Sequence, residues 1–551
     1  MTFSAVSVLI ITLLWHFCPL HALTISRNSP DIVNTGYAKY LGNRTSPNSV
    51  AYLGIPYAEP PLGERRFRAP LPLDTNRLLW LHRGRVINAT TYPDFCVQGG
   101  RSSDVNDAGG AGSEDCLKVN IYTPVGANRR SKLPVLFYIH GGGYIFGNPA
   151  YWSFNHWIHQ SPNVVVVTVY YRLSSFGFLA VPEFRDPKYG DFNAGFKDQI
   201  QALRWVKKNI ASFGGDPSKV TINGQSAGGS SVELHMVAKA TLGEKLFSKA
   251  IAQSVYRTPL PTPDQKVALF QFYATQAGCE SGSVADQLGC LRKASVGTLA
   301  QAQDAAERLF PPTTYDLFQP VIDGHLFDEP PTISILKGRF AKVPLIVGAT
   351  SNETLTGGLN ASWALSSYFP SLNESDIKEI ESLYPLSDFD SETQQQEVIS
   401  GDSELRCARS IMGHASSRYA PTWTYRYNQK DPTENGTAVN HAAENWMMFL
   451  GVSGGPNGTA TYTPQNPVQI AFSHELIAYW LSFVRTGNPN TFKLPRSPRW
   501  DGYNAWRKTR IVLQQSPDDD PKKSGIFAEL EDGKETRRCE VVASKAEGQQ
   551  S

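Results

Sequence analysis

The chain has 551 residues, of which 41% are hydrophobic and 19% charged, a composition typical of a globular protein large enough for an extensive core. Its 52 Lys and Arg against 50 Asp and Glu give a formal net charge of +2, without a long basic run. The basic footprint of a nucleic-acid-binding protein is therefore missing, and we expect no nucleic-acid partner.

The N-terminus begins with an apolar run over residues 5–15, which is shorter than the ~20 residues needed to cross a bilayer. Together with Pro19 and the small Ala22, this run predicts a signal peptide over residues 1–22. A short membrane anchor is the alternative interpretation. The polar segment from Lys545 to Ser551 argues against a lipid-anchor signal. We expect a secreted, extracellular protein without stable membrane insertion.

Residues 23–551 are expected to form one domain, because no internal repeat or long linker divides them. Six cysteines remain after the leader is removed: Cys96, Cys116, Cys279, Cys290, Cys407 and Cys539. An even number suits an oxidising compartment. Short loops close most easily, which favours Cys96 with Cys116 and Cys279 with Cys290. Cys407 with Cys539 follows by elimination, although a pair of free buried thiols is the alternative there.

Cysteine pairs with metal-binding spacing, such as C-x-x-C, do not occur, and we expect neither a metal site nor an organic cofactor. Seven N-glycosylation sequons occur; the one at Asn352 is expected to stay unglycosylated, and the other six agree with secretion. They lie at Asn43, Asn88, Asn360, Asn373, Asn435 and Asn457.

Strands and helices alternate through the rest of the chain. The uninterrupted apolar run over residues 164–169 is typical of a strand that is covered on both faces. The spacing of Ile200, Leu203, Val206 and Ile210 predicts an amphipathic helix over residues 197–210. This alternation predicts an α/β fold with a mostly parallel central sheet and helices on both faces. Further strands are expected at 133–139, 220–222, 249–254, 343–347 and 422–427, and a further helix at 473–484.

A G-x-S-x-G pattern connects the strand at 220–222 to a helix that begins at Ala227. A serine at such a sharp turn projects its hydroxyl from a strained backbone, and it needs small residues two positions away on either side. Gly224 and Gly228 supply them around Ser226. A chance Gly-Ser turn is the alternative, but the flanking strand and helix favour a nucleophile.

A nucleophilic serine needs donors for the oxyanion, a base and an acid that orients the base. Gly142 and Gly143 follow the strand at 133–139, and with Ala227 they are the expected backbone donors.

We predict His441 as the base rather than His414 or His474, because it follows a loop after the strand at 422–427. His474 falls in a helical pattern beside Glu475, which we expect to be a solvated face. Glu353 comes directly after the strand at 343–347 and is the predicted acid, whereas Asp323 is expected to be a turn residue.

The chain resembles the type-B carboxylesterases, a family that includes secreted fungal lipases and esterases and the cholinesterases. The resemblance covers nearly the whole chain after the leader. It is carried by residues 54–61, 114–117 with 120, 140–143, 171–173 with 177–179, 213–217 and 224–229.

The resemblance implies an α/β-hydrolase fold, a catalytic triad of Ser226, Glu353 and His441, and an oxyanion hole at Gly142, Gly143 and Ala227. It also implies the disulfides Cys96–Cys116 and Cys279–Cys290, and more loosely Cys407–Cys539.

Several positions depart from the family pattern. Thr354 follows the predicted acid where the family usually has Gly, and Gln225 precedes the nucleophile where cholinesterases have Glu. The loop between Cys96 and Cys116 has no Trp, so we do not expect a quaternary ammonium substrate. The same loop is polar and is predicted to be mobile, unlike the amphipathic lid of related lipases, so we do not expect interfacial activation.

The expected function is that of a secreted serine carboxylic ester hydrolase acting through an acyl-enzyme on small or medium hydrophobic esters. His441 would take the proton of Ser226, and Glu353 would stabilise the imidazolium. The alternatives are a tailoring esterase or acyltransferase of secondary metabolism, a triacylglycerol lipase, and a non-catalytic cholinesterase-like adhesion protein.

Overall fold

The computed structural model describes residues 31–551 apart from 101–111, 311–314, 316 and 456–457. The predicted signal peptide over residues 1–22, residues 101–111 of the loop predicted to be mobile, and the sequon at Asn457 lie outside the described residues.

A thirteen-stranded sheet forms the centre of the described chain, in the order β1-β2-β3-β5-β7-β6-β8-β9-β10-β11-β14-β15, with β4 beside β2. Two further short strands, β12 and β13, pair with each other. The strands are β1 (Ile32–Asn34), β2 (Lys39–Ser46), β3 (Ser49–Pro56), β4 (Val86–Ala89), β5 (Lys118–Pro124), β6 (Leu133–Ile139), β7 (Val165–Val169), β8 (Gly215–Gln225), β9 (Lys249–Gln253), β10 (Leu345–Thr350), β11 (Thr422–Tyr427), β12 (Val452–Gly454), β13 (Ala460–Tyr462), β14 (Thr509–Leu513) and β15 (Phe527–Leu530).

The central strands from β7 to β14 in the sheet order are all parallel to one another. The N-terminal strands β1, β2, β3 and β5, and the far edge strand β15, add antiparallel pairs at the two ends of the sheet. The predicted α/β class with a mostly parallel central sheet is confirmed. Because parallel strands end at the same edge, the loops after β6, β8, β10 and β11 gather there.

The apolar run in β7 faces two cores at once. Val165, Val167 and Val169 belong to one hydrophobic cluster, whereas Val164 and Val166 belong to the other. Successive side chains of a strand point to opposite faces, so a run that is apolar apart from the buried Thr168 requires cover on both.

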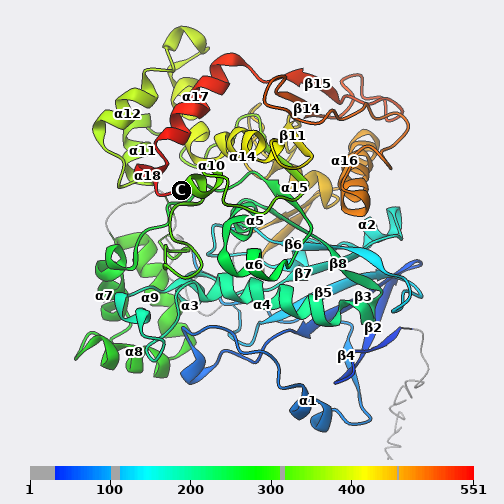
Figure 1. Cartoon of the computed structure of the whole chain (residues 1–551), viewed down its shortest axis with the longest axis vertical. Coiled ribbons are helices and arrows are strands. Elements are labelled where there is room, and N and C mark those ends of the chain that lie inside the picture. The colour runs from blue at the N-terminus through cyan, green and yellow to red at the C-terminus, as the bar shows by residue number, and fades with distance from the viewer. Residues whose placement is uncertain (1–30, 101–111, 311–314, 316, 456–457) are drawn as a thin grey trace, which may run out of the picture.

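Helices supply that cover. Apolar residues of α4, α5 and α14 join the first cluster, and those of α2, α15 and α16 join the second (Figure 1). The helices are α1 (Thr75–Leu81), α2 (Asn155–Gln160), α3 (Ser174–Phe178), α4 (Ala194–Asn209), α5 (Ala227–Val237), α6 (Lys239–Glu244), α7 (Val267–Gln276), α8 (Val284–Lys293), α9 (Val296–Leu309), α10 (Pro331–Leu336), α11 (Ala361–Tyr368), α12 (Glu374–Glu381), α13 (Glu392–Gly401), α14 (Cys407–Ser417), α15 (Ala443–Met448), α16 (Pro467–Thr486), α17 (Gly533–Ser544) and α18 (Ala546–Gln549).

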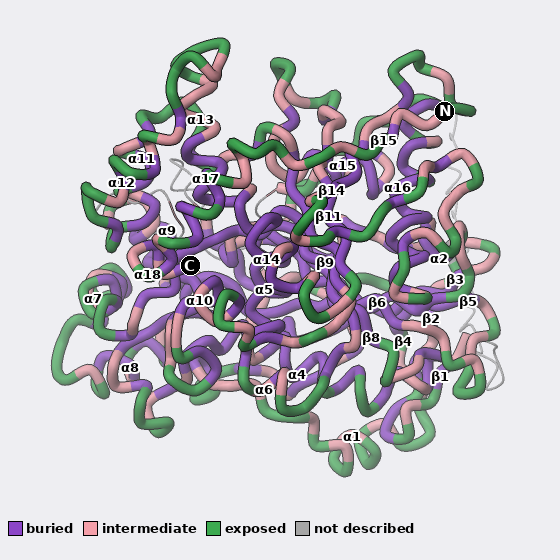
Figure 2. Tube along the Cα trace, turned by 45° about the horizontal axis from the view of Figure 1, so that its top comes forward, coloured by how far each residue is buried: buried purple, intermediate pink, exposed green. Residues whose placement is uncertain are grey.

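Burial follows the same layers. The sheet and the helices α5 and α14 are largely buried in the middle of the molecule, and the exposed segments lie at its periphery (Figure 2). Within the described residues, no helix combines the length and the apolar character needed to cross a membrane.

The helix predicted over residues 473–484 is longer than expected. It spans Pro467–Thr486, because Asn466 caps it in a capping box and Gly487 ends it with a positive φ of 76°. The prediction that Glu475 lies on a solvated face is wrong: its side chain is buried and bonds Ser524 Oγ at 2.6 Å, although the adjacent His474 is exposed as expected.

Candidate active site

Ser226 is the single residue between the end of β8 and the start of α5, and its backbone angles are φ 59° and ψ −126°. A Cβ atom at Gly224 would lie 2.3 Å from the carbonyl oxygen of Gly228, and one at Gly228 would lie 2.1 Å from that of Ile139. Larger residues at either glycine would therefore force the strand, the turn and the helix apart. The close packing explains the G-x-S-x-G spacing and holds Ser226 in its strained conformation.

His441 connects Ser226 to Glu353. Its Nε2 lies 2.7 Å from Ser226 Oγ, and its Nδ1 lies 2.5 Å from Glu353 Oε1. The other carboxylate oxygen of Glu353 accepts a hydrogen bond from the backbone N–H of Thr350 at 3.2 Å. Glu353 is completely buried, and Ser226 is 8% exposed. The three residues form one continuous hydrogen-bonded line.

The loops that carry the acid and the base are joined to each other. The N–H of Asn352 donates to the carbonyl of Val439 at 3.2 Å, and the N–H of Val439 donates to Asn352 Oδ1 at 3.0 Å. Since Asn352 precedes Glu353 by one residue and Val439 precedes His441 by two, this pair of bonds sets the distance between the two side chains.

The glycine loop after β6 lies directly against the serine. A Cβ at Gly141 would lie 2.9 Å from Ser226 Cβ. Gly142 and Gly143 have φ angles of 102° and 62°. Throughout the described part of the chain, the N–H groups of Gly142, Gly143 and Ala227 donate to no other residue. They are therefore available for an oxygen atom of a substrate.

Comparison with known proteins identifies the family. The model of the carboxylesterase family matches residues 29–529. The chain belongs to the carboxylesterase family. Para-nitrobenzyl esterase of Bacillus subtilis is 32% identical over 499 residues, which are 88% of this chain and 94% of that protein. Carboxylesterase 1C of Rattus norvegicus is 32% identical over 536 residues, which are 89% of this chain and 91% of that protein.

Solved structures agree with the sequence comparison. The crystal structure of Aspergillus niger EstA superimposes with a TM-score of 0.82 at 29% identity, covering 96% of this chain and all of that one. A structure titled PNB esterase has a TM-score of 0.74 at 29% identity, covering 93% of this chain and 99% of that one. The predicted α/β-hydrolase fold is confirmed, and the protein is a carboxylic ester hydrolase.

The electrostatics of this carboxylesterase favour a basic imidazole. Burial alone would lower the pKa of His441, but the hydrogen bond and negative charge of Glu353, with smaller contributions from Glu444 and Glu404, raise it above its ordinary value. Burial, with the nearby charge of Glu353, raises the pKa of Glu444 to about 7. Ser254 Oγ donates to Glu444 at 3.4 Å. Two buried carboxyl groups besides the predicted acid therefore act on His441.

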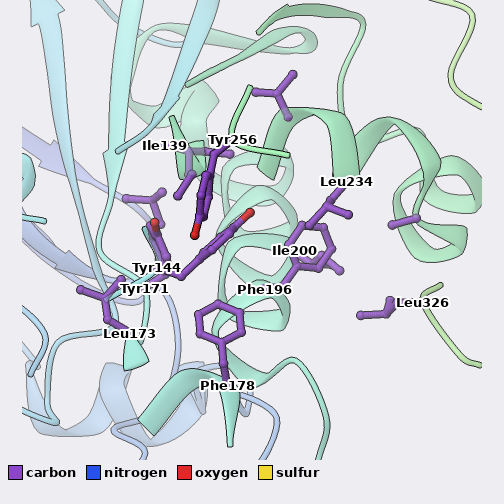
Figure 3. Close-up of a cluster of buried hydrophobic side chains, with 14 of the residues drawn as sticks. Ile139, Tyr144, Tyr171, Leu173, Phe178, Phe196, Ile200, Leu234, Tyr256 and Leu326 are labelled. Carbon is purple, nitrogen blue, oxygen red and sulfur yellow. The ribbon is translucent and has the colours of Figure 1, made fainter. Parts of the chain in front are cut away.

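His140 supports the glycine loop rather than the chemistry. Burial lowers its pKa to about 4, so the imidazole is neutral near pH 7. Its ring stacks on Tyr171 with the centroids 4.5 Å apart, and Tyr171 Oη donates to the carbonyl of His140 at 2.9 Å. Tyr171 and Tyr144 lie in a buried cluster with residues of α4 and α5 (Figure 3). The buried aromatic rings of this carboxylesterase thus form a rigid support for its glycine loop.

The other histidines and carboxylates considered from the sequence lie elsewhere. His414 is on α14 and His474 is on the exposed side of α16. Asp323 Oδ1 accepts hydrogen bonds from the backbone N–H groups of His325, Leu326 and Phe327, as expected of a turn residue.

Sequence reasoning noted Gln225 but missed three other buried polar residues beside the site: Glu404, Glu444 and Asn445. Glu444 could have been noticed because it lies three residues from His441. No sequence signal points to Glu404, which is 51 residues after Glu353.

Three disulfides join the cysteines in the pairs expected from the sequence: Cys96–Cys116, Cys279–Cys290 and Cys407–Cys539. The third connects α14 to α17. Of the sequon asparagines, those at 88, 360, 373 and 435 are exposed, and Asn43 is partly buried, with its Nδ2 donating to the carbonyl of Thr90 at 2.9 Å.

Proposed function

We propose that this carboxylesterase cleaves its substrates through an acyl-enzyme on Ser226, with His441 as the general base and Glu353 as the acid that orients it. The main observation in support of this proposal is the continuous line of hydrogen bonds from Glu353 through His441 to Ser226, with distances of 2.5 and 2.7 Å. A serine hydroxyl becomes a strong nucleophile only when a base can take its proton as it attacks.

In the first half-reaction, Ser226 Oγ attacks the ester carbonyl carbon while His441 Nε2 takes the hydroxyl proton. The N–H groups of Gly142, Gly143 and Ala227 donate to the oxyanion, and Glu353 stabilises the imidazolium. The tetrahedral intermediate then collapses, the bond to the alcohol oxygen breaks, and His441 gives its proton to the leaving alcohol. An acyl group remains on Ser226.

In the second half-reaction, a water molecule takes the place of the alcohol. His441 removes a proton from the water as its oxygen attacks the acyl carbon, and the same N–H groups hold the oxyanion. Collapse releases the carboxylic acid and returns the proton to Ser226 Oγ. The sum is one ester and one water converted to one acid and one alcohol.

The proposed substrates are small or medium hydrophobic carboxylic esters. Gln225, directly before the nucleophile, is an uncharged side chain whose Oε1 accepts a hydrogen bond from Asn445 Nδ2 at 3.0 Å. A carboxylate at this position would attract a cationic substrate, and the amide does not. The names of the relatives, para-nitrobenzyl esterase and carboxylesterase 1C, agree with this substrate class.

Secretion is a further part of the proposal, with residues 1–22 as the cleaved leader and 23–551 as the catalytic domain. Three disulfides support an oxidising compartment. Glycans are proposed at Asn43, Asn88, Asn360, Asn373, Asn435 and Asn457. N-terminal sequencing and mass spectrometry of the protein from the culture medium would test both points. An intact leader, or protein retained in the cells, would contradict them.

The deciding experiment is hydrolysis of p-nitrophenyl esters from acetyl to palmitoyl by the wild type and by Ser226→Ala. We expect activity that peaks at short or medium chains and a loss of at least about 10³-fold in kcat for the variant. Activity that rises above the solubility limit of the long esters would instead favour a triacylglycerol lipase. Wild-type turnover by a folded Ser226→Ala protein would refute the mechanism.

A further inference from the structure

The loop that carries the predicted acid is held by a segment that sequence reasoning did not single out. Between α13 and α14 the helix widens into a π-helical turn, Asp402–Arg406. Such turns are rare and occur frequently at functional sites. This turn packs against the residues on both sides of Glu353.

Glu404, in this turn, binds the loop after the acid. Its Oε2 accepts a hydrogen bond from the N–H of Leu355 at 2.8 Å, and Thr354 Oγ1 lies 3.5 Å from the same oxygen. Its Oε1 accepts a short hydrogen bond from the hydroxyl of Thr356. One carboxylate therefore faces donors from three consecutive residues that follow Glu353.

Arg406, two residues further on, binds the loop before the acid. Its Nη1 donates to the carbonyl of Ser351 at 3.0 Å, and its Nη2 lies 3.0 Å from Asp402 Oδ1. The π-helical turn thus holds the loop on both sides of Glu353.

The backbones are also in direct contact. A Cβ atom at Gly401, the residue before the turn, would lie 1.9 Å from the carbonyl oxygen of Glu353. Gly401 has the helical angles φ −64° and ψ −34°, which any residue can adopt. A glycine is therefore needed at this position because of the close contact, and not because of the backbone conformation. The turn and the acid loop therefore cannot move independently.

Thr354 occupies the position where the family usually has glycine. Its Oγ1 lies 3.0 Å from Ser400 Oγ in addition to its approach to Glu404. The side chain that departs from the family pattern is thus part of the contact between the loop and the π-helical turn.

We propose that Glu404 is a positioning residue for ester hydrolysis, which acts by holding the Leu355 and Thr356 segment so that Glu353 stays aligned with His441. This inference rests on the proposed function, in which Glu353 is the catalytic acid. Glu404 is completely buried, and its carboxylate has hydrogen-bond donors at both oxygens, so an amide in its place must leave a buried donor without an acceptor.

The charge of Glu404 contributes as well. Burial raises its own pKa, and its negative charge helps to raise the pKa of His441, beside the larger effects of Glu353 and Glu444. Arg257 brings a cation to this turn, because its guanidinium Nη1 donates to the carbonyl of Ser403 at 2.5 Å. Loss of the Glu404 charge should therefore lower the pKa of His441.

The test is a double-mutant cycle on the full chain with p-nitrophenyl acetate. For Glu404→Gln we expect kcat to fall at least about tenfold, KM to change less than about threefold, and the acidic limb of the kcat/KM profile to move to lower pH. In a Glu353→Gln background, Glu404→Gln should cause little further loss, because its effect passes through Glu353. Equal losses in both backgrounds would overturn the proposal.

A matched control and a milder variant keep the test decisive. Glu475 is another buried carboxylate that bonds a loop hydroxyl, that of Ser524 at 2.6 Å, and Glu475→Gln should lower Tm without changing kcat. If Glu404→Gln does not fold, Thr356→Val removes one donor and should lower kcat about threefold. Wild-type kcat in folded Glu404→Gln or in Thr356→Val would overturn the positioning role. Activity retained by Ser226→Ala would instead overturn the proposed function.

Discussion

Gln225 Nε2 lies 3.4 Å from Nε2 of His441, the same imidazole nitrogen that lies 2.7 Å from Ser226 Oγ. Asn445 Nδ2 donates to Gln225 Oε1 at 3.0 Å, and this bond directs the amide nitrogen toward the imidazole. An N–H group that faces the lone pair of Nε2 favours the neutral base over the imidazolium.

A charge at this position should change the pH dependence of the reaction. In Gln225→Glu, a carboxylate near Nε2 would stabilise the imidazolium and raise the pKa of His441. Because only the neutral imidazole can act as the base, the acidic limb of kcat/KM should move to higher pH by about one unit. Gln225→Met, of similar length and uncharged, is the control: it removes the N–H group without adding a charge, so its midpoint should move in the same direction by much less than in Gln225→Glu. If the acidic limb of kcat/KM in Gln225→Glu had the same midpoint as in the wild type, the side chain at position 225 would not lie near the imidazole.

Glu444 should make the folded state less stable as the pH rises. Burial raises its pKa from 4.5 to about 7, so its contribution to stability is fully present below about pH 4.5 and is lost as the pH passes through about 7. The free energy of unfolding of Glu444→Gln, relative to that of the wild type, should therefore rise by on the order of 1–3 kcal/mol between pH 5 and pH 8. Urea unfolding at both pH values measures this. Glu374→Gln on α12, whose side chain is 93% exposed, should show no such gain.

Gly401→Ala should disturb the acid loop. The added methyl group would lie 1.9 Å from the carbonyl oxygen of Glu353. The overlap should lower the free energy of unfolding by about 1–3 kcal/mol, and it should also lower kcat. Gly289→Ala on α8 is the matched control, because nothing lies within 4 Å of a Cβ there, and it should stabilise the protein by about 0.5–1 kcal/mol. Equal thermal stability and turnover in the two variants would contradict the close approach at Gly401.

The Cys407–Cys539 disulfide should contribute most to stability among the three. It joins residues 132 positions apart, whereas Cys279–Cys290 joins residues 11 apart. Replacing both Cys407 and Cys539 by serine should lower the free energy of unfolding by about 2–4 kcal/mol, and the same change at Cys279 and Cys290 should lower it by less. Thermal unfolding of the two double variants compares them directly. A larger loss at the shorter bridge would mean that native-state contacts outweigh loop closure.

Features that depend on neighbouring residues were predictable from the sequence. The Gly224 and Gly228 spacing around Ser226 follows from close packing within a single turn, and the unbroken apolar run of β7 follows from the alternation of side chains in a strand. The strand predicted at 343–347 is shifted, since β10 spans Leu345–Thr350. The paired N-terminal strands β2 and β3 were not predicted from the sequence.

Chain order left three candidate histidines, and the choice of His441, like that of Glu353 over Asp323, rested on whether each residue follows a predicted strand. The tertiary structure brings His441 to Glu353 through the reciprocal hydrogen bonds between Asn352 and Val439, which are 87 residues apart. Glu475 was predicted to be exposed and is buried, because Ser524 and Arg496 reach it from a distant segment.

Sequence alone thus determined the nucleophile turn, the glycine loop and the class of fold, because short-range sterics and side-chain periodicity act within a few residues. Which acid meets which base, and that Glu404 reaches across to the loop after Glu353, were decided only when the parallel strands packed side by side and brought the loops at their ends together. Contacts between segments 49 or more residues apart depend on how the whole sheet and its helices pack, and no local pattern encodes that arrangement.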